Sequence, residues 1–253
     1  MLHIWELTIP QLPPEDLVRR AYLYLPEAYD EDPEARFPVL YMFDGQNVFQ
    51  DSDASFGRSW RMLEYLEETG APVIVAAVES NPVGNYRLSE YSPFTHVDSE
   101  LGEIEGRGRI MMDWLVHTFK PMIDDTFRTL PDRENTAIAG SSMGGLMSLY
   151  AACHYGSFFS RFACLSPSVW VHPGKVRRML HRAHIPQDTI LYLDYGEQEL
   201  SNHAETGDML PSVFQSLYAQ GVNVTLRIVP GGEHSEACWQ QQIPVFMACL
   251  GLI

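Results

Sequence analysis

The sequence predicts an α/β fold built on a mostly parallel, doubly wound sheet of about eight strands, with helices on both faces. Two observations carry this prediction. Short continuous apolar runs occur from residue 38 onward, as is typical of central strands that are covered on both faces. Helix-like stretches separate these runs, so right-handed crossovers between parallel strands are expected.

The elements follow in order along the chain. Residues 3–9 and 20–25 alternate apolar and polar side chains, which predicts antiparallel strands at an edge of the sheet. Continuous apolar runs predict central strands at 38–43, 72–78, 136–139 and 190–193, and the alternating run 222–229 predicts a strand nearer the far edge. Helices are expected at 59–68, 110–127, 145–155, 176–184, 210–219 and 237–249.

Two stretches lack a regular apolar period. Residues 27–34 are rich in acidic side chains and proline, which predicts a surface loop. Residues 79–108 predict a longer loop, and long loops in compact domains tend to be functional, so we expect this one to form a wall of the active site. No repeat, low-complexity tract or linker divides the sequence, and a single domain over residues 1–253 is expected.

The composition of the chain argues against two classes of binding partner. The 253 residues include 17 basic and 33 acidic side chains, giving a formal net charge of −16, which repels nucleic acid and anionic membranes. The longest apolar run, 72–78, falls far short of the roughly 20 residues that span a bilayer. We therefore expect neither partner, while a homo-oligomer stays open.

Cysteine usage and the amino terminus bear on location. Cys153, Cys164, Cys238 and Cys249 show no CxxC spacing and mostly lie in apolar runs, which favours buried free thiols in a reducing compartment. The first residues show no secretion signal. We expect a cytoplasmic protein, and removal of a leader stays open.

A G-x-S-x-G motif carries the chemistry. Gly140, Ser142 and Gly144 lie between the predicted strand 136–139 and the helix that follows. This context is that of a nucleophile elbow, a tight turn that exposes a serine hydroxyl above the sheet. The amino terminus of the following helix would stabilise developing negative charge at the same place.

A nucleophilic serine needs a histidine base and an acid that orients it, in the chain order serine, acid, histidine that is typical of the α/β-hydrolase fold. His234 is the preferred base because its Gly-rich loop, 230–236, directly follows the last predicted strand. The other histidines after Ser142 are His154, His172 and His203, together with His181 and His184, which we assign to a helix.

Three carboxylates could supply the acid. Asp194, Glu197 and Glu199 all lie at or just beyond the end of the strand predicted at 190–193. Asp194 falls within the strand, where a structural role is the alternative. Residue types and spacing alone do not separate Glu197 from Glu199.

An oxyanion hole needs two backbone N–H groups. Met143, directly after the serine, would supply one. The loop after the strand 38–43 would supply the other, with Gly45 allowing the turn and Gln46 donating the N–H. A plain Asp-Gly turn is the alternative interpretation of this loop.

Four segments occur in the order found in a known family: 41–49, with YMFDGQNVF, 87–93, with RLSEYSP, 140–145, with GSSMGG, and 165–170, with LSPSVW. Over residues 22–234 the chain resembles the putative-esterase family of α/β-hydrolases. This group includes enterochelin esterase-like enzymes, feruloyl and acetylxylan esterases, S-formylglutathione hydrolase and mycolyltransferases.

The resemblance implies a cofactor-free esterase with a Ser-Glu-His triad. In many relatives the acid follows a glycine in a G-x-x-E pattern, which here selects Glu199. The family's R-x-x-E-Y loop falls on Arg87, Glu90 and Tyr91 and implies that an ion pair braces the site. Gly45, Asn47, Arg87 and Trp170 are the residues expected at the substrate pocket.

The expected function is hydrolysis of short-chain acyl or feruloyl esters, of sugars or phenolics, as small molecules or oligosaccharides. Acyl transfer from the same serine and siderophore ester hydrolysis are the alternatives, although the chain lacks the added domain often found in siderophore esterases. A catalytically inactive binding protein is the non-enzyme alternative. His181 and His184 lack a third ligand nearby in sequence, so no metal site is expected.

Overall fold

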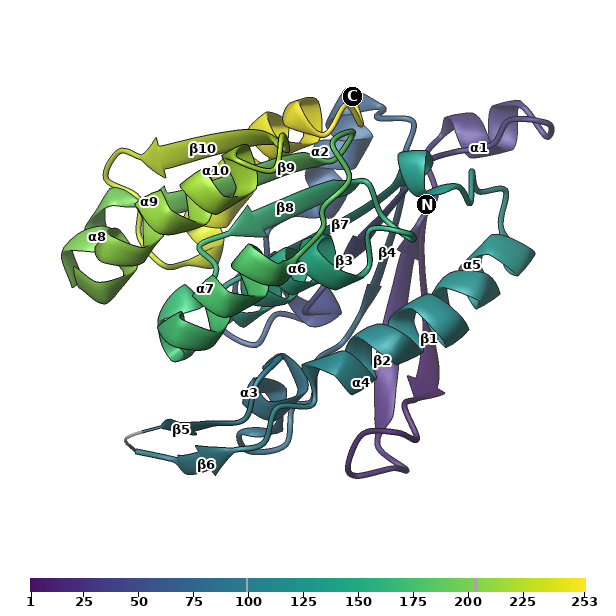
Figure 1. Ribbon diagram of the computed structural model, residues 1–253. Coiled ribbons are helices and arrows are strands. Elements are labelled where there is room, and N and C mark those ends of the chain that lie inside the picture. The colour runs from purple at the N-terminus through teal and green to yellow at the C-terminus, as the bar shows by residue number, and fades with distance from the viewer. Residues whose placement is uncertain (99, 203) are drawn as a thin grey trace.

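A computed structural model describes residues 1–98, 100–202 and 204–253. An eight-stranded sheet runs through the molecule in the order β1-β2-β4-β3-β7-β8-β9-β10 (Figure 1). Its strands are β1 (Leu2–Thr8), β2 (Val18–Tyr24), β3 (Val39–Met42), β4 (Ile74–Val78), β7 (Thr136–Ser141), β8 (Arg161–Leu165), β9 (Ile190–Gly196) and β10 (Asn223–Val229).

The pairing confirms the predicted sheet. Strands β4, β3, β7, β8, β9 and β10 are parallel neighbours, and β1 and β2 join antiparallel at one edge. Because the carboxyl ends of the parallel strands meet at one edge, the loops that follow β3, β7, β9 and β10 converge there.

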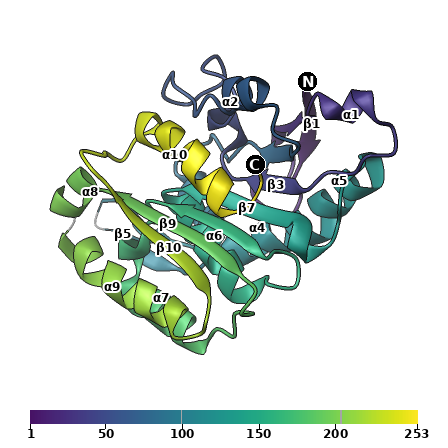
Figure 2. The same cartoon turned by 90° about the horizontal axis from the view of Figure 1, so that it is seen from above.

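Helices cover both faces of the sheet. Their bounds are α1 (Ala28–Glu31), α2 (Met62–Thr69), α3 (Tyr86–Glu90), α4 (Gly108–Trp114), α5 (Lys120–Thr126), α6 (Met143–His154), α7 (Pro173–Arg182), α8 (Glu197–Asn202), α9 (Ala204–Tyr218) and α10 (Glu236–Cys249). Side chains from α2 and α10 belong to one buried cluster, and those from α4, α6, α7 and α9 belong to the other. Figure 2 shows α10 lying across the sheet.

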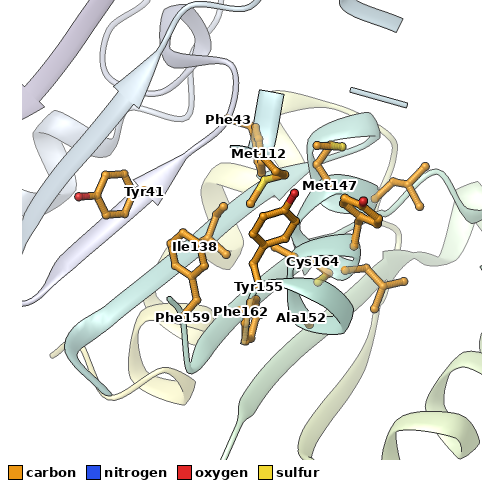
Figure 3. Packing of buried hydrophobic residues seen from close by; sticks show 14 of the residues in the cluster. Tyr41, Phe43, Met112, Ile138, Met147, Ala152, Tyr155, Phe159, Phe162 and Cys164 are labelled. Atoms are coloured by element: carbon orange, nitrogen blue, oxygen red, sulfur yellow. The ribbon is translucent and has the colours of Figure 1, made fainter. Parts of the chain in front are cut away.

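The packing of strand β3 on both of its faces explains why its sequence is continuously apolar. Val39 and Tyr41 pack into one cluster, and Leu40 and Met42 pack into the other. Since successive side chains of a strand point to opposite faces, both faces need apolar residues. Figure 3 shows part of the first cluster, in which Ile138 from β7 and Phe162 from β8 lie near Phe159.

The structure corrects several predicted elements. Strand β8 was not predicted, because it opens with Arg161 and none of its five residues is a β-branched Val, Ile or Thr, which are typical of strands. The span 79–108 is wrong as a single loop: it contains α3 and a hairpin of β5 (His96–Asp98) and β6 (Gly102–Ile104). The helix expected at 110–127 is interrupted by a π-helical turn, Leu115–Phe119, just before Pro121, which cannot donate a helical hydrogen bond.

Within the described part of the chain, none of the helices is both long and apolar enough to cross a membrane.

Candidate active site

Ser142 occupies a strained turn between β7 and α6. Its φ of 57° and ψ of −121° lie outside the regions that a serine ordinarily adopts. The turn is tight because a Cβ on Gly140 would lie 2.7 Å from the carbonyl carbon of Gly144, and one on Gly145 would lie 2.5 Å from the carbonyl oxygen of Leu165. The glycines of the motif are therefore required by close backbone packing, and they leave the Ser142 side chain at the carboxyl edge of the sheet.

His234 and Glu199 meet beside this serine. The Nδ1 atom of His234 lies 2.6 Å from Oε2 of Glu199. Glu199 comes from α8, after β9, and His234 comes from the loop after β10, so two strand ends bring them together. Ser142 and His234 line the same cavity, which has a volume of about 600 Å³.

The second oxygen of Glu199 is also bonded. Oε1 accepts hydrogen bonds from the N–H of Gly196, at 2.8 Å, and from the hydroxyl of Ser166, at 2.6 Å. Burial alone would raise the pKa of Glu199, but the hydrogen bonds from His234, Ser166 and Gly196 outweigh it and hold the pKa below its ordinary value. Glu199 is therefore held as a carboxylate against the imidazole.

The other two candidate carboxylates have different partners. Asp194 accepts hydrogen bonds from the N–H of Ser166, at 3.1 Å, and from the hydroxyl of Tyr192, at 2.8 Å. Glu197 accepts one from the N–H of Gly231, at 2.9 Å. The structure thus pairs Glu199 with His234 and assigns Asp194 a buried structural position.

The remaining histidines lie elsewhere or are not described. His154 ends α6, His172 packs edge-on against Phe94, and His181 lies in α7. His184 follows α7 rather than lying within it, because the helix ends at Arg182. His203 lies outside the described residues.

The turn after β3 lies next to the serine. Asp44 adopts a left-handed conformation with φ of 56°, and a 3₁₀ turn, Gly45–Asn47, follows. A Cβ on Gly45 would lie 2.8 Å from the backbone of Val78, so this position needs glycine. The Gln46 side chain is fixed by Ser80, whose N–H and hydroxyl lie 3.1 and 2.9 Å from its amide.

The two residues predicted to donate to an oxyanion each lie in the first turn of a helical segment. Gln46 belongs to this 3₁₀ turn, and Met143 is the first residue of α6. N–H groups in the first turn of a helix have no partner within that helix and can bind an anion. This arrangement suits the two-donor hole expected from the sequence.

The loop that carries Arg87, Glu90 and Tyr91 braces this turn through partners outside the loop. Arg87 binds Asp44 with both ends of its guanidinium, at 2.6 and 2.7 Å. The Tyr91 hydroxyl accepts the Asp44 N–H at 3.1 Å. Glu90 pairs with Arg19 at 2.5 Å in the interior.

Five segments line the cavity: 43–47, 55–60, 79–87, 141–142 and 234–239. Gln46, Asn47 and Arg87 line it, as do residues of the segment 79–87. Gly45 instead packs behind the lining against Val78, and Trp170, which is 39% exposed, is not among the lining residues in the described chain. Lining residues that the sequence did not single out are Phe56, Trp60, Glu79, Asn81, Glu236 and Trp239.

Comparison with known proteins agrees with this architecture. The family profile described as "Putative esterase" matches residues 18–248. A Bacillus subtilis protein of uncharacterised function is 26% identical over 154 residues, which is 60% of this chain but only 58% of that protein. The alignment therefore leaves a large part of this curated relative uncovered.

Two solved structures share the fold. The siderophore hydrolase EstA from Aspergillus nidulans superposes with a TM-score of 0.74 at 18% identity, covering 99% of this chain and 94% of that one. A ferulic acid esterase gives 0.66 at 16% identity, covering 100% and 97%. The fold is the one found in these two hydrolases. The chain belongs to the putative esterase family.

Proposed function

We propose that this chain is a serine carboxylic-ester hydrolase that works through Ser142, Glu199 and His234 and an acyl-enzyme. The observation that carries the proposal is the 2.6 Å contact between Glu199 and His234 beside the strained Ser142, at one cavity. A serine hydroxyl is a weak nucleophile at neutral pH, and a histidine held by a carboxylate is the usual means of activating it.

In the proposed reaction His234 takes the proton of Ser142 as Oγ attacks the ester carbonyl. Glu199 accepts the Nδ1–H of His234 and stabilises the imidazolium that forms. The proton then passes to the departing alcohol, leaving Ser142 acylated. Water attacks the acyl group by the same route in reverse, which releases the acid and restores the serine.

The amides of Met143 and Gln46 would bind the oxyanion of each tetrahedral intermediate. The N-terminal end of α6 adds its dipole at this point. Removing one such donor typically costs about a hundredfold or more in turnover. The tight fit of Gly45 against Val78 supports this role, because it fixes the backbone of the turn that carries Gln46.

Short-chain acyl or feruloyl esters of sugars or phenolics are the proposed substrates. Phe56, Trp60 and Trp239 give the cavity apolar rings, while Asn81 and Gln46 give it hydrogen-bonding groups. Aromatic faces with polar neighbours suit phenolic and sugar rings. The similarity to a ferulic acid esterase is consistent with this class.

Siderophore ester hydrolysis is the second candidate, favoured by the likeness to the Aspergillus siderophore hydrolase. The charge of the cavity argues against anionic forms of such ligands. Three carboxylates, Asp44, Glu79 and Glu236, are among the described lining residues. Asp44 pairs with Arg87 and Glu79 pairs with Arg20, so Glu236 gives the cavity its excess of negative charge. We therefore rank neutral esters first.

A cytoplasmic location is part of this proposal. Cys153, Cys164, Cys238 and Cys249 are all free thiols in the structure, which supports a reducing compartment.

The test is hydrolysis of p-nitrophenyl acetate, methyl ferulate and acetylated xylo-oligosaccharide by wild type and Ser142→Ala. Turnover should fall by several orders of magnitude in the variant, because the three residues act as a unit. Ser160→Ala, a buried serine at the far end of β8, serves as the matched control. Retention of most activity by Ser142→Ala would contradict the proposal.

A further inference from the structure

We propose that Ser166 and Trp239 are positioning residues that lock Glu199, and through it His234, in the orientation needed to activate Ser142. This inference rests on the proposed function. Neither residue has a chemical step of its own in that mechanism.

Four side chains form a closed ring of contacts. Glu199 Oε2 lies 2.6 Å from His234, and Glu199 Oε1 lies 2.6 Å from the Ser166 hydroxyl. The indole N–H of Trp239 donates to that same hydroxyl at 3.0 Å. The Trp239 ring then meets the His234 ring edge-on, with centroids 4.9 Å apart and planes at 83°.

The direction of each hydrogen bond in this ring follows from chemistry. An indole N–H can only donate, so the Ser166 oxygen must accept from Trp239. The single proton of the Ser166 hydroxyl is therefore directed to Glu199, which as a carboxylate can only accept. With Oε1 occupied by Ser166 and Gly196, Oε2 is left for the imidazole.

Ser166 is itself fixed by its backbone. It lies just beyond β8 with φ of 41°, a left-handed conformation that is costly for a serine. Its N–H lies 3.0 Å from the carbonyl oxygen and 3.1 Å from Oδ1 of Asp194, which is buried. The end of β9 thus holds the residue that orients the acid.

Trp239 links this anchor to the helix that follows His234. It lies near the start of α10, is buried, and packs against Trp60 with centroids 6.1 Å apart. The loop that carries His234 joins β10 to α10, and the imidazole is 43% exposed at its cavity side. Because a partly exposed ring on a loop has several accessible rotamers, contacts on two sides restrict it to one.

The experiment uses a fluorophosphonate probe. Ser142 Oγ attacks its phosphorus, fluoride leaves and His234 takes the serine proton, so the labelling rate reports the activation of Ser142 without an ester substrate. Labelling rates are measured against probe concentration for wild type, Ser166→Ala, Trp239→Phe and the double variant. The maximal rate should fall about ten- to a hundredfold in Ser166→Ala, as for loss of a hydrogen bond to a charged group. Trp239→Phe removes the indole N–H together with the five-membered ring and keeps one aromatic ring, and should cost about three- to tenfold.

Two readouts separate positioning from a general structural role. The half-saturating probe concentration of Ser166→Ala should stay within about twofold while the maximal rate falls, because Ser166 is not among the described residues that line the cavity. The double variant should be no slower than Ser166→Ala, since the indole acts through Ser166. Multiplying effects in the double variant, or labelling of Ser166→Ala at the wild-type rate, would overturn the inference.

Controls keep the outcomes distinct. Ser160→Ala removes a buried serine at the opposite end of β8, and Trp114→Phe alters a buried tryptophan that stacks on Phe119, so both should label like wild type. If wild type is labelled in this pattern yet hydrolyses no ester, the proposed function fails while the positioning role stands. If wild type hydrolyses esters and Ser166→Ala labels normally, the positioning role alone fails.

Discussion

Arg87 and Asp44 form a bidentate ion pair, and Asp44 directly precedes the 3₁₀ turn that contains Gln46. The guanidinium Nε lies 2.6 Å from Asp44 Oδ1, and its terminal nitrogen lies 2.7 Å from Oδ2. Asp44 holds a left-handed backbone, which few non-glycine residues adopt without support. The ion pair therefore stabilises the conformation from which the proposed oxyanion donor projects.

This relationship makes Arg87→Lys informative. A lysine keeps the charge but cannot bind both carboxylate oxygens in a fixed plane. We expect kcat/KM for p-nitrophenyl acetate to fall about tenfold, because small displacements of an oxyanion donor are costly. Steady-state kinetics give the loss, and urea denaturation should show a smaller cost of about 1 kcal/mol.

Arg107→Lys is the matched control for this change. Arg107 lies in the same segment and pairs with Glu105, whose side chain is 63% exposed, away from the cavity lining. Its variant should retain wild-type kinetics. Equal losses in the two variants would mean that loss of either guanidinium in this segment lowers activity, and that Arg87 has no specific role in holding the turn.

The sheet could be predicted from sequence because its central strands bury both faces. Runs such as 72–78 leave no polar face, and few other elements require that pattern. Strand β8 was not predicted because, unlike the other central strands, it contains no β-branched residue. The β5–β6 hairpin has strands of three residues each, too short for any periodicity to emerge.

Some residues of the candidate site could also be predicted from the sequence, and others could not. Ser142 and His234 lie beside glycines that local packing requires, so a short window of sequence reveals them. Ser166 donates to Glu199 across 33 residues of chain and accepts from Trp239 across 73, and no local pattern encodes such contacts. The choice of Glu199 over Glu197 likewise needed the resemblance to a family, and the structure then paired Glu199 with His234.

Glu236 should set the charge preference of the cavity. It lies in the first turn of α10 and lines the cavity near Asp44 and Arg87. Burial raises its pKa, and the nearby Asp44 adds to that rise. Glu236→Gln should improve kcat/KM for p-nitrophenyl hemisuccinate relative to p-nitrophenyl acetate about fivefold, as expected for removing about 1 kcal/mol of charge repulsion.

Glu233→Gln tests whether that effect is local. Glu233 is exposed on the loop that leads to α10 and is not among the lining residues in the described chain. The Glu233→Gln substitution removes the same charge from the protein as Glu236→Gln, but it leaves the charge of the cavity unchanged. If both variants changed the ratio equally, the net charge of the protein rather than Glu236 would determine selectivity.

Phe56 should favour aromatic acyl groups. It lines the cavity, yet its side chain is 80% exposed, which leaves an aromatic face free to stack on a substrate ring. Phe56→Ala should lower kcat/KM for methyl ferulate about fivefold through KM and leave methyl acetate within about twofold. Tyr218→Ala, an exposed aromatic on α9, should change neither rate, and unaltered ferulate kinetics in Phe56→Ala would exclude a stacking role.

Asp194 should give the protein a distinctive dependence of stability on pH. It is 1% exposed, and burial raises its pKa to about 7. An aspartate in the unfolded chain has a pKa of about 3.9, so the folded state binds this proton more tightly. Unfolding therefore releases a proton between about pH 4 and pH 7, and the free energy of unfolding falls as the pH rises through that window.

Asp194→Asn removes this titration while keeping an oxygen that can accept the Ser166 N–H. The two proteins can differ in their free energy of unfolding at about pH 4. From there to about pH 8, the free energy of unfolding of the variant should rise relative to that of wild type by up to about 4 kcal/mol, the full cost of ionising a group whose pKa is shifted by about three units. Urea denaturation at several pH values measures the difference, with the exposed Asp125→Asn as control. If the free energies of unfolding of wild type and Asp194→Asn ran parallel against pH, the buried carboxyl would not change protonation in this range. Asp194 would then accept the Ser166 N–H in one charge state throughout.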